Sequence, residues 1–439
     1  MENFSKFPWE ERDLAQQLTN AKKLIDCQAS HVFTELFDVT GYADDGKSSN
    51  HLINEQYLNN AIVSVKDLFD VKGYKTKAGS TFLNDVDIAS EDADAVKSLR
   101  EAGAVLLGHT NMTELAYSGL GLNPHYGTPI TPLYKNEVRI AGGSTSGGAV
   151  SVALQIADIA LGSDTGGSLR IPSAFCGVTG FKPSQNSVSR KGSLPLSSSL
   201  DSVGPIAKTV SECEIAWGVM SNNIVNNPVA KEAHFVVPNN FGMDLLDEKV
   251  KEAFTELVNI LKQTPGVTVE EKALPFLDSY KLLPVWQFSA FEAMSYYTEN
   301  YDINLDELDP RVASRLKRAN TIDEKQFLAT CEQRKLLIDR YKKEEKGAVL
   351  LLPTVAVLPP KLDQLTADED YDRINLLCLR NTTLANVLDG CSVSLPYQYQ
   401  EDHIGIMLTA SNGDDNNLIS LSKLIETIIL KSCLGKQQK

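Results

Sequence analysis

The sequence lacks any hydrophobic run long enough for a membrane helix, and it has no excess of basic residues. No stretch of about 18 apolar residues occurs, so we expect no membrane span. The N-terminal residues MENFSKFPWEERDLAQQL contain no basic segment followed by an apolar one, so no secretory signal is expected. Lys and Arg number 42 against 57 Asp and Glu, which gives a net charge of −15. This sign does not suit phosphate binding, so we expect no direct binding of nucleic acid.

The cysteine and histidine patterns do not fit common structural or metal-binding frameworks. The seven cysteines are odd in number and scattered, and no two form a C-x-x-C pair. This spread predicts reduced thiols in a cytoplasmic protein rather than a disulfide framework or a zinc site. The six histidines are also isolated, with no H-E-x-x-H spacing. Neither a metal nor another cofactor is therefore expected.

What the sequence does contain is an alternation of strand-like and helix-like segments. Hydrophobic residues make up 42% and charged residues 23% of the 439, as is typical of a globular protein. The β-branched run AIVSVKDLFDV at 61–71 predicts a buried strand, SEDADAVKSLREAGA at 90–104 predicts a helix, and AVLLGHTN at 104–111 predicts the next strand. Alternation at this length predicts an α/β fold with a largely buried sheet.

The same patterns divide the chain into four consecutive parts, which we expect to form one domain. Residues 1–55 show mostly helical periodicity, and residues 58–215 carry the alternating strands and helices. Residues 216–345 are helical and charged, and we expect them to form a helical elaboration outside the sheet. Within 346–439 the run GAVLLLPTVAVLPP predicts a buried strand that ends at a proline. The chain is therefore expected to return to the sheet.

Two loops rich in glycine and serine dominate the sequence, at Ala141–Ala149 and Gly162–Arg170. The simplest interpretation is a pair of turns that need glycine. A phosphate-binding loop is poorly supported, because the first loop continues with alanine where G-K-[ST] would be required. Neither loop has G-x-G-x-x-G with an acidic residue about 20 positions on. The third interpretation is that the serines are reactive groups.

Ser168 and Lys66 support this third interpretation. The two glycines before Ser168 would let several backbone N–H groups point into one space, as an oxyanion hole requires. A serine nucleophile needs a base, and no histidine stands in a G-x-S-x-G context. Lys66 interrupts an apolar strand, where burial would lower its pKa and leave an amine able to accept a proton. Taken alone, Lys66 is better explained as a surface lysine paired with Asp67.

Three motifs, in this order along the chain, resemble the amidase signature family of Ser–Ser–Lys hydrolases. They are VKD at 65–67, GGSTSGG at 142–148 and SDTGGSLRIPSAFCG at 163–177. The resemblance implies a large mixed and mostly buried β-sheet that is wrapped by helices on both faces. It also implies that Ser168 is the acylated nucleophile, that Ser144, 24 positions earlier, is a relay serine, and that Lys66 is the general base.

The resemblance further implies how the backbone around these residues is used. The N–H groups of Thr165, Gly166, Gly167 and Ser168 would form the oxyanion hole. The peptide bond between Gly143 and the relay serine would be cis.

Three more polar residues are expected to support the site. Arg170 could pair with Asp164 and hold the loop, which makes both structural rather than catalytic. Asn111 matches a family position beside the active site and could make a polar contact there.

The first glycine- and serine-rich loop departs from the family's commoner GGSSSGS pattern at Thr145 and Gly148. These changes leave the relay serine in place.

The function implied by the resemblance is hydrolysis of a small linear carboxamide. No cofactor would be needed, and the protein would be a cytoplasmic monomer or homodimer without nucleic-acid or membrane partners. The alternative is the glutaminase-type A subunit of a glutamyl/aspartyl-tRNA amidotransferase, which SSLDSVGPIAKTV also resembles. Residues 309–396 look more like stand-alone bacterial amidases. A catalytically inactive relative is a third possibility, which the intact triad disfavours.

Overall fold

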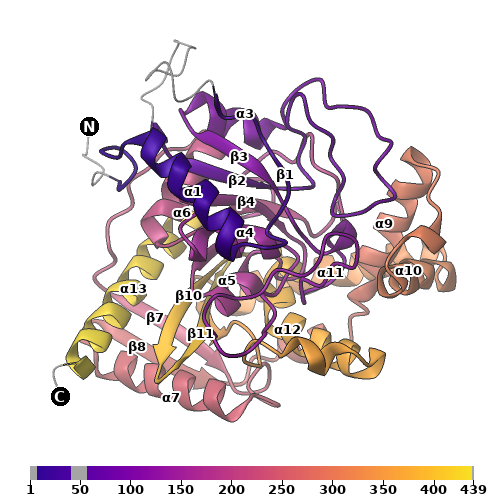
Figure 1. The fold of residues 1–439 in the computed structure, drawn as a ribbon. Helices are drawn as coiled ribbons and strands as arrows, with labels where there is room; N and C mark the ends of the chain where they lie inside the picture. The colour runs from indigo at the N-terminus through magenta and orange to yellow at the C-terminus, as the bar shows by residue number, and fades with distance from the viewer. Residues whose placement is uncertain (1–6, 41–56, 438–439) are drawn as a thin grey trace.

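The computed structural model describes residues 7–40 and 57–437, and the strands of these residues all lie in one sheet (Figure 1). The sheet has eleven strands in the order β1-β3-β2-β4-β6-β5-β10-β11-β9-β7-β8. Parallel pairs at β3-β2-β4 and β9-β7-β8 flank a central antiparallel region, so the sheet is mixed. The strands are β1 (Phe33–Leu36), β2 (Ile62–Lys66), β3 (Val105–Thr110), β4 (Ile159–Asp164), β5 (Thr179–Lys182), β6 (Ser202–Ala207), β7 (Ala233–Pro238), β8 (Val267–Lys272), β9 (Val349–Pro353), β10 (Cys391–Tyr399) and β11 (Asp402–Ala410).

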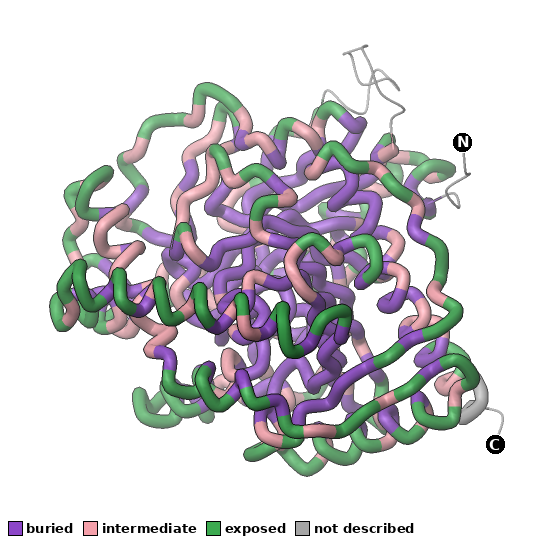
Figure 2. Tube along the Cα trace, turned by 180° about the vertical axis from the view of Figure 1, so that it is seen from behind, coloured by how far each residue is buried: buried purple, intermediate pink, exposed green. Residues whose placement is uncertain are grey.

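Helices cover both faces of this sheet, and the interior strands are buried between them (Figure 2). One face is covered by α3 (Asp94–Glu101), α6 (Val210–Met220), α7 (Glu248–Gln263) and α13 (Asp415–Gln437). The other face is covered by α1 (Leu14–Gln28), α4 (Ser146–Ala153), α5 (Arg170–Cys176), α8 (Phe276–Tyr280), α11 (Glu324–Glu344) and α12 (Asp368–Val387). The predicted fold class, a large mixed sheet wrapped on both faces, is confirmed.

Two further helices, α9 (Trp286–Asn300) and α10 (Pro310–Lys317), pack at one side of the molecule (Figure 1). They reach the chain segment that follows β3, where the Asp309 N–H donates a hydrogen bond of 2.6 Å to Glu114 Oε2. The Arg315 side chain donates another, of 2.9 Å, to the carbonyl of Tyr117. Among the helices in the described part of the chain, none is long and apolar enough to cross a membrane.

The alternation of side chains along β2 fixes the direction of Lys66. Successive residues of a strand point to opposite faces of the sheet. Val63 and Val65 join the large apolar cluster on one face, whereas the Ser64 hydroxyl bonds to Ser151 of α4 on the other, at 2.8 Å. Lys66 shares the Ser64 face, so its side chain is directed toward the α4 layer. All five residues of β2 are buried.

The structure corrects the expectation that residues 216–345 are a helical elaboration outside the sheet. This part does supply α7 to α11, but it also contributes the parallel strands β7 and β8 at one edge. β8 reads VTVEEK, with three of its six residues exposed and one buried, and it lacks the apolar run by which a buried strand is recognised. Residues 1–55 likewise contain an edge strand, β1, besides α1, and residues 1–6 and 41–55 of that part lie outside the described residues. The 346–439 part contributes β9, β10 and β11 to the same sheet.

Candidate active site

The Lys66 side chain lies completely buried at the carboxyl end of β2. Its Nζ donates hydrogen bonds to Ser144 Oγ at 2.7 Å and to Ser163 Oγ at 2.9 Å. Burial lowers the pKa of Lys66 to about 7, although the negative charges of Asp164 and Asp201 act in the opposite direction. A substantial fraction of the amine is therefore neutral near pH 7, which a proton acceptor requires.

Sheet topology brings these groups together. β2 and β4 are neighbouring parallel strands, so their carboxyl ends meet at one edge of the sheet. Lys66 ends β2, Ser163 lies near the end of β4, and Ser144 stands two residues before α4. The Gly143–Ser144 peptide bond is cis, as the resemblance implies. A side chain at Gly143 would meet the Gly121 backbone nitrogen at 2.6 Å, so only glycine fits this close approach.

Ser168 follows β4 and lines a cavity of about 440 Å³. The Thr145 N–H donates to the Ser168 carbonyl at 3.2 Å, which joins the two glycine- and serine-rich loops through their backbones. Among the described residues, no hydrogen bond joins the hydroxyls of Ser144 and Ser168. The structure therefore brings Lys66 into contact with Ser144 but not Ser144 into hydrogen-bonding contact with Ser168.

The backbone N–H groups around Ser168 differ in whether they already donate a hydrogen bond to the protein. In the described part of the chain, those of Thr165, Gly166 and Ser168 donate to no protein acceptor, and all three residues line the cavity. The Gly167 N–H instead donates to Asp164 Oδ1 at 2.9 Å. Of the four N–H groups predicted to form an oxyanion hole, that of Gly167 is not available, because a donor already used by a buried carboxylate is not free for a substrate.

Asp164 and Arg170 form a fully buried ion pair that supports the Ser168 loop. Arg170 donates from Nη2 to Asp164 Oδ1 at 2.8 Å and from Nε to Oδ2 at 3.0 Å. Burial alone would raise the pKa of Asp164, but the charge and hydrogen bonds of Arg170, together with Lys182 and Asn386, outweigh it and the pKa is about 2. The guanidinium also donates to the Thr382 carbonyl and to Asn386 Oδ1 of α12, each at 2.8 Å. Both side chains are buried away from the cavity and hold the loop to α12.

Asn111 also has a supporting position. Its Nδ2 donates to the carbonyls of His31 and Gly127, each at 2.8 Å, and its Oδ1 accepts the Met112 N–H at 2.8 Å. The Gly147 N–H donates to the Asn111 carbonyl at 2.9 Å, so this residue fastens the start of α4. Asn111 does not line the cavity at Ser168.

Sequence reasoning missed two residues of this site. Ser163 contacts Lys66, although nothing in its motif distinguishes it from an ordinary loop serine. Asp201 accepts hydrogen bonds from the Thr165 hydroxyl at 2.5 Å and from the N–H groups of Leu196 and Ser197, each at 3.0 Å. Burial raises the pKa of Asp201 to about 6, against these hydrogen bonds. Asp201 could have been found from its place in SSLDSVGP, which belongs to the segment that resembles the amidotransferase A subunit.

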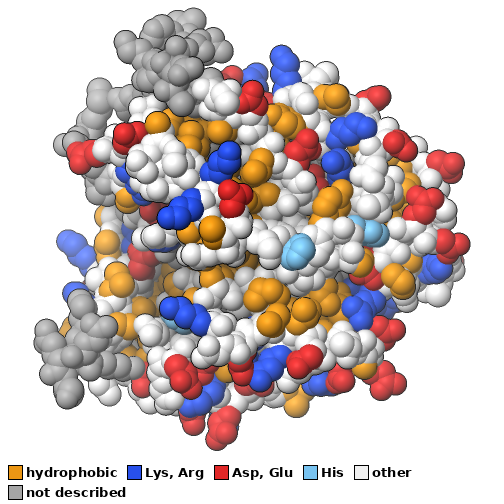
Figure 3. Space-filling model, viewed as in Figure 1, with side chains coloured by type: hydrophobic (Ala, Val, Ile, Leu, Met, Phe, Trp, Pro, Cys, Tyr) orange, Lys and Arg blue, Asp and Glu red, His pale blue; other side chains and the backbone are white. Residues whose placement is uncertain are grey.

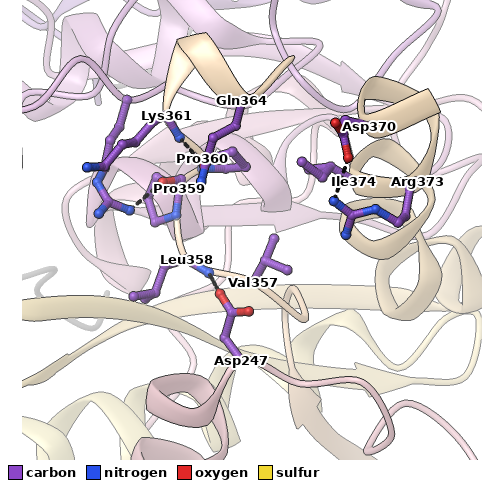
Figure 4. A pocket seen from close by; sticks show the side chains of 11 residues that line it. Asp247, Val357, Leu358, Pro359, Pro360, Lys361, Gln364, Asp370, Arg373 and Ile374 are labelled. Atoms are coloured by element: carbon purple, nitrogen blue, oxygen red, sulfur yellow. Dashed lines mark hydrogen bonds and ion pairs between the residues drawn. The ribbon is translucent and has the colours of Figure 1, made fainter. Parts of the chain in front are cut away.

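A second cavity, of about 550 Å³, lies between the Pro359–Pro360 segment and α12 and contains none of these residues (Figure 4). Arg373 there pairs with Asp370 at 2.9 Å, and the Leu358 N–H donates to Asp247 at 2.9 Å. Its polar groups are engaged with one another, so the cavity at Ser168 is the better candidate. In the described part of the chain, no three His, Cys, Asp or Glu side chains gather as a metal site would require.

Comparison with known proteins identifies the family. The family model "Amidase" matches residues 12–419. The chain is 30% identical over 385 residues to the 2-amino-5-chloromuconic acid deaminase of Comamonas testosteroni, covering 84% of this chain and 81% of that protein. It is 28% identical over 420 residues to the A subunit of the glutamyl-tRNA(Gln) amidotransferase of Methanococcus vannielii, and the match covers 90% of this chain and 93% of that subunit. A crystal structure of an amidase aligns with a TM-score of 0.83 at 28% identity, and the alignment covers 95% of this chain and 96% of the amidase. The chain therefore belongs to the amidase family of hydrolases, as the resemblance implied, and its expected chemistry is on carbon–nitrogen bonds.

Proposed function

We propose that this protein is a cytoplasmic amidohydrolase that cleaves small linear carboxamides through an acyl-enzyme on Ser168. Lys66 is the general base, and Ser144 carries the proton between Lys66 and the nucleophile. The observation that supports this assignment most is the hydrogen bond from a fully buried Lys66, with a pKa of about 7, to Ser144. A buried lysine whose pKa is lowered to near neutrality and which contacts a hydroxyl group is a typical feature of catalytic sites.

The proposed reaction follows from these groups. Neutral Lys66 takes the hydroxyl proton of Ser144, and Ser144 takes that of Ser168, whose hydroxyl turns toward it when substrate binds. Ser168 Oγ attacks the amide carbonyl, and free N–H groups of Thr165, Gly166 and Ser168 stabilise the oxyanion. The protonated lysine returns its proton along the same path to the leaving nitrogen, and the C–N bond breaks. Water then attacks the acyl-enzyme and releases a carboxylic acid.

The second candidate is the glutaminase component of a tRNA-dependent amidotransferase. Its support is the similarity, over 90% of this chain, to the corresponding A chain of a glutamyl-tRNA(Gln) amidotransferase. We favour the stand-alone enzyme, a monomer or homodimer, because residues 309–396 look more like stand-alone amidases. Purification from the native host separates the two. Recovery as a monomer or homodimer that releases ammonia from simple amides supports the amidase, whereas an obligate heteromer with glutaminase activity supports the amidotransferase component.

The nucleophile is tested by trapping it with a serine-directed fluorophosphonate. We expect Ser168→Ala to lose both the label and amide hydrolysis, since no other hydroxyl would be activated. Ser289→Ala is the matched control, because Ser289 also lines the cavity but lies on α9, away from the free N–H groups. Peptide mapping of the label to Ser289, or full ammonia release by a folded Ser168→Ala protein, would reject the assignment.

A further inference from the structure

The cavity at Ser168 carries an excess of positive charge that the rest of the chain does not. Its charged lining residues are Arg315, Arg318, Arg380 and Asp372, which are three guanidinium groups and one carboxylate. The whole chain has a net charge of −15. Acidic and basic side chains are interspersed on the face shown in Figure 3, whereas arginines outnumber carboxylates in the lining of the cavity.

Two of the three arginines are already engaged with protein groups. Arg315 donates from Nη2 to Asp372 Oδ1 at 2.9 Å and from Nη1 to the Tyr117 carbonyl at 2.9 Å. Arg380 donates to the carbonyls of Asp244 and Gly242, at 2.5 and 3.1 Å. These two guanidinium groups hold the walls of the cavity together.

Arg318 is different, because its guanidinium has no hydrogen-bond or carboxylate partner among the described residues. Its Cζ lies 4.2 Å from the centroid of the Trp286 ring. The ring is attracted to the cation and leaves the edge of the guanidinium free. Arg318 immediately follows α10 and Trp286 begins α9, and both line the cavity. Arg318 is an exposed residue, so the cavity is lined at this point by a solvent-accessible cation that stacks on Trp286 and whose N–H groups have no protein partner among the described residues.

The cavity also has an apolar part of its wall. Leu196, Leu200, Leu376 and Leu379 line the cavity together with Val285. Its volume of about 440 Å³ falls within the usual range of small-molecule sites. An alkyl or aryl chain would bury these side chains, and a polar group at its far end could reach the free guanidinium.

We propose that the substrates are amides that carry a carboxylate at the end away from the scissile bond, and that Arg318 binds this carboxylate. The proposal rests on the amidohydrolase function proposed above and names the substrate class of that site. One free guanidinium presents parallel N–H groups that match the two oxygens of a carboxylate, and its single positive charge balances the single negative charge of that group. Arg318 is therefore a specificity-determining residue, and the leucines accommodate the chain between the two functional groups.

The test compares amides of equal length that differ in one terminal group. The monoamides of succinic, glutaric and adipic acid are paired with butanamide, pentanamide and hexanamide, and ammonia release gives kcat/KM for each. We expect the carboxylated member of the preferred pair to be favoured by roughly tenfold or more, which is typical of a hydrogen-bonded charged group. Arg318→Gln should remove this preference by slowing only the carboxylated amide.

Lys317→Gln is the matched control, because it removes an exposed cation from the preceding position that does not line the cavity. It should leave the preference unchanged. Equal losses for both amides in Arg318→Gln, or the same loss of preference in Lys317→Gln, would overturn the proposal while leaving amide hydrolysis established.

A binding measurement keeps the proposal testable without turnover. Calorimetric titration of the wild type with adipate should give binding that is weakened about tenfold or more in Arg318→Gln. Absent or unchanged binding would refute the carboxylate site. If no amide were hydrolysed and Ser168 were not labelled, yet adipate binding depended on Arg318, the proposed function would fail and the carboxylate site would stand.

Discussion

The burial of Lys66 predicts how amide hydrolysis depends on pH. With a pKa of about 7, about half of the Lys66 amines are neutral at pH 7, about a tenth at pH 6 and about a hundredth at pH 5. Because only the neutral amine can accept the Ser144 proton, kcat/KM should fall about tenfold for each pH unit below 7 and level off above about pH 8. Initial rates of ammonia release across this range measure the midpoint.

A single substitution should move that midpoint in a known direction. The charge of Asp201 raises the pKa of Lys66, so Asp201→Asn should shift the midpoint to lower pH. The single asparagine oxygen can replace only one of the two carboxylate oxygens, which accept from the Thr165 hydroxyl and from the N–H groups of Leu196 and Ser197, so the fold of the variant is first checked by circular dichroism. Asp306→Asn, at an exposed position on the 3₁₀ helix Leu305–Glu307, is the control and should not move it. A flat profile between pH 5 and 7 would refute Lys66 as the base, and a midpoint unaffected by Asp201→Asn would refute the electrostatic coupling of Asp201 to Lys66.

Two further predictions concern the Ser168 loop. Arg170→Met leaves the buried Asp164 carboxylate without its cation, and we expect a loss of about 3–5 kcal/mol in the free energy of unfolding, measured by urea titration; an unchanged unfolding midpoint would contradict this role. Gly167→Ala places a Cβ 2.3 Å from Thr382 Oγ1 at a backbone φ of +136°, so the loop must shift. Fluorophosphonate labelling of Ser168 should slow at least about tenfold, and labelling at the wild-type rate would show that the loop geometry is not critical.

The sequence predicted the residues of the site better than the contacts among them. The VKD motif and its apolar context indicated Lys66, and period-two alternation along β2 explains why its side chain points to the α4 layer. Ser163 was missed because its contact with Lys66 depends on the parallel pairing of β2 with β4, which no local pattern specifies. The use of the Gly167 N–H by Asp164 likewise depends on the folded loop.

The fold outside the motifs was harder to predict. β8 is a polar edge strand, and its VTVEEK sequence is equally suited to the end of a helix or a loop. The stacking of Arg318 on Trp286 joins residues from different helices, and the packing of those helices is set by tertiary contacts rather than by periodicity. The cavity that determines substrate choice could therefore be recognised only in three dimensions.

The buried ion pair that supports the Ser168 loop depends on a part of the chain that is synthesised much later. Asp164 and Arg170 are synthesised more than 200 residues before Thr382 and Asn386, the α12 residues that enclose them. Until α12 arrives, this guanidinium remains hydrated and the turn carrying Ser168 lacks its outer support. A nascent chain that ends before α12 thus already contains every proposed catalytic residue, but the loop that carries Ser168 is not yet held in its final position. α12, which is synthesised late, completes this support.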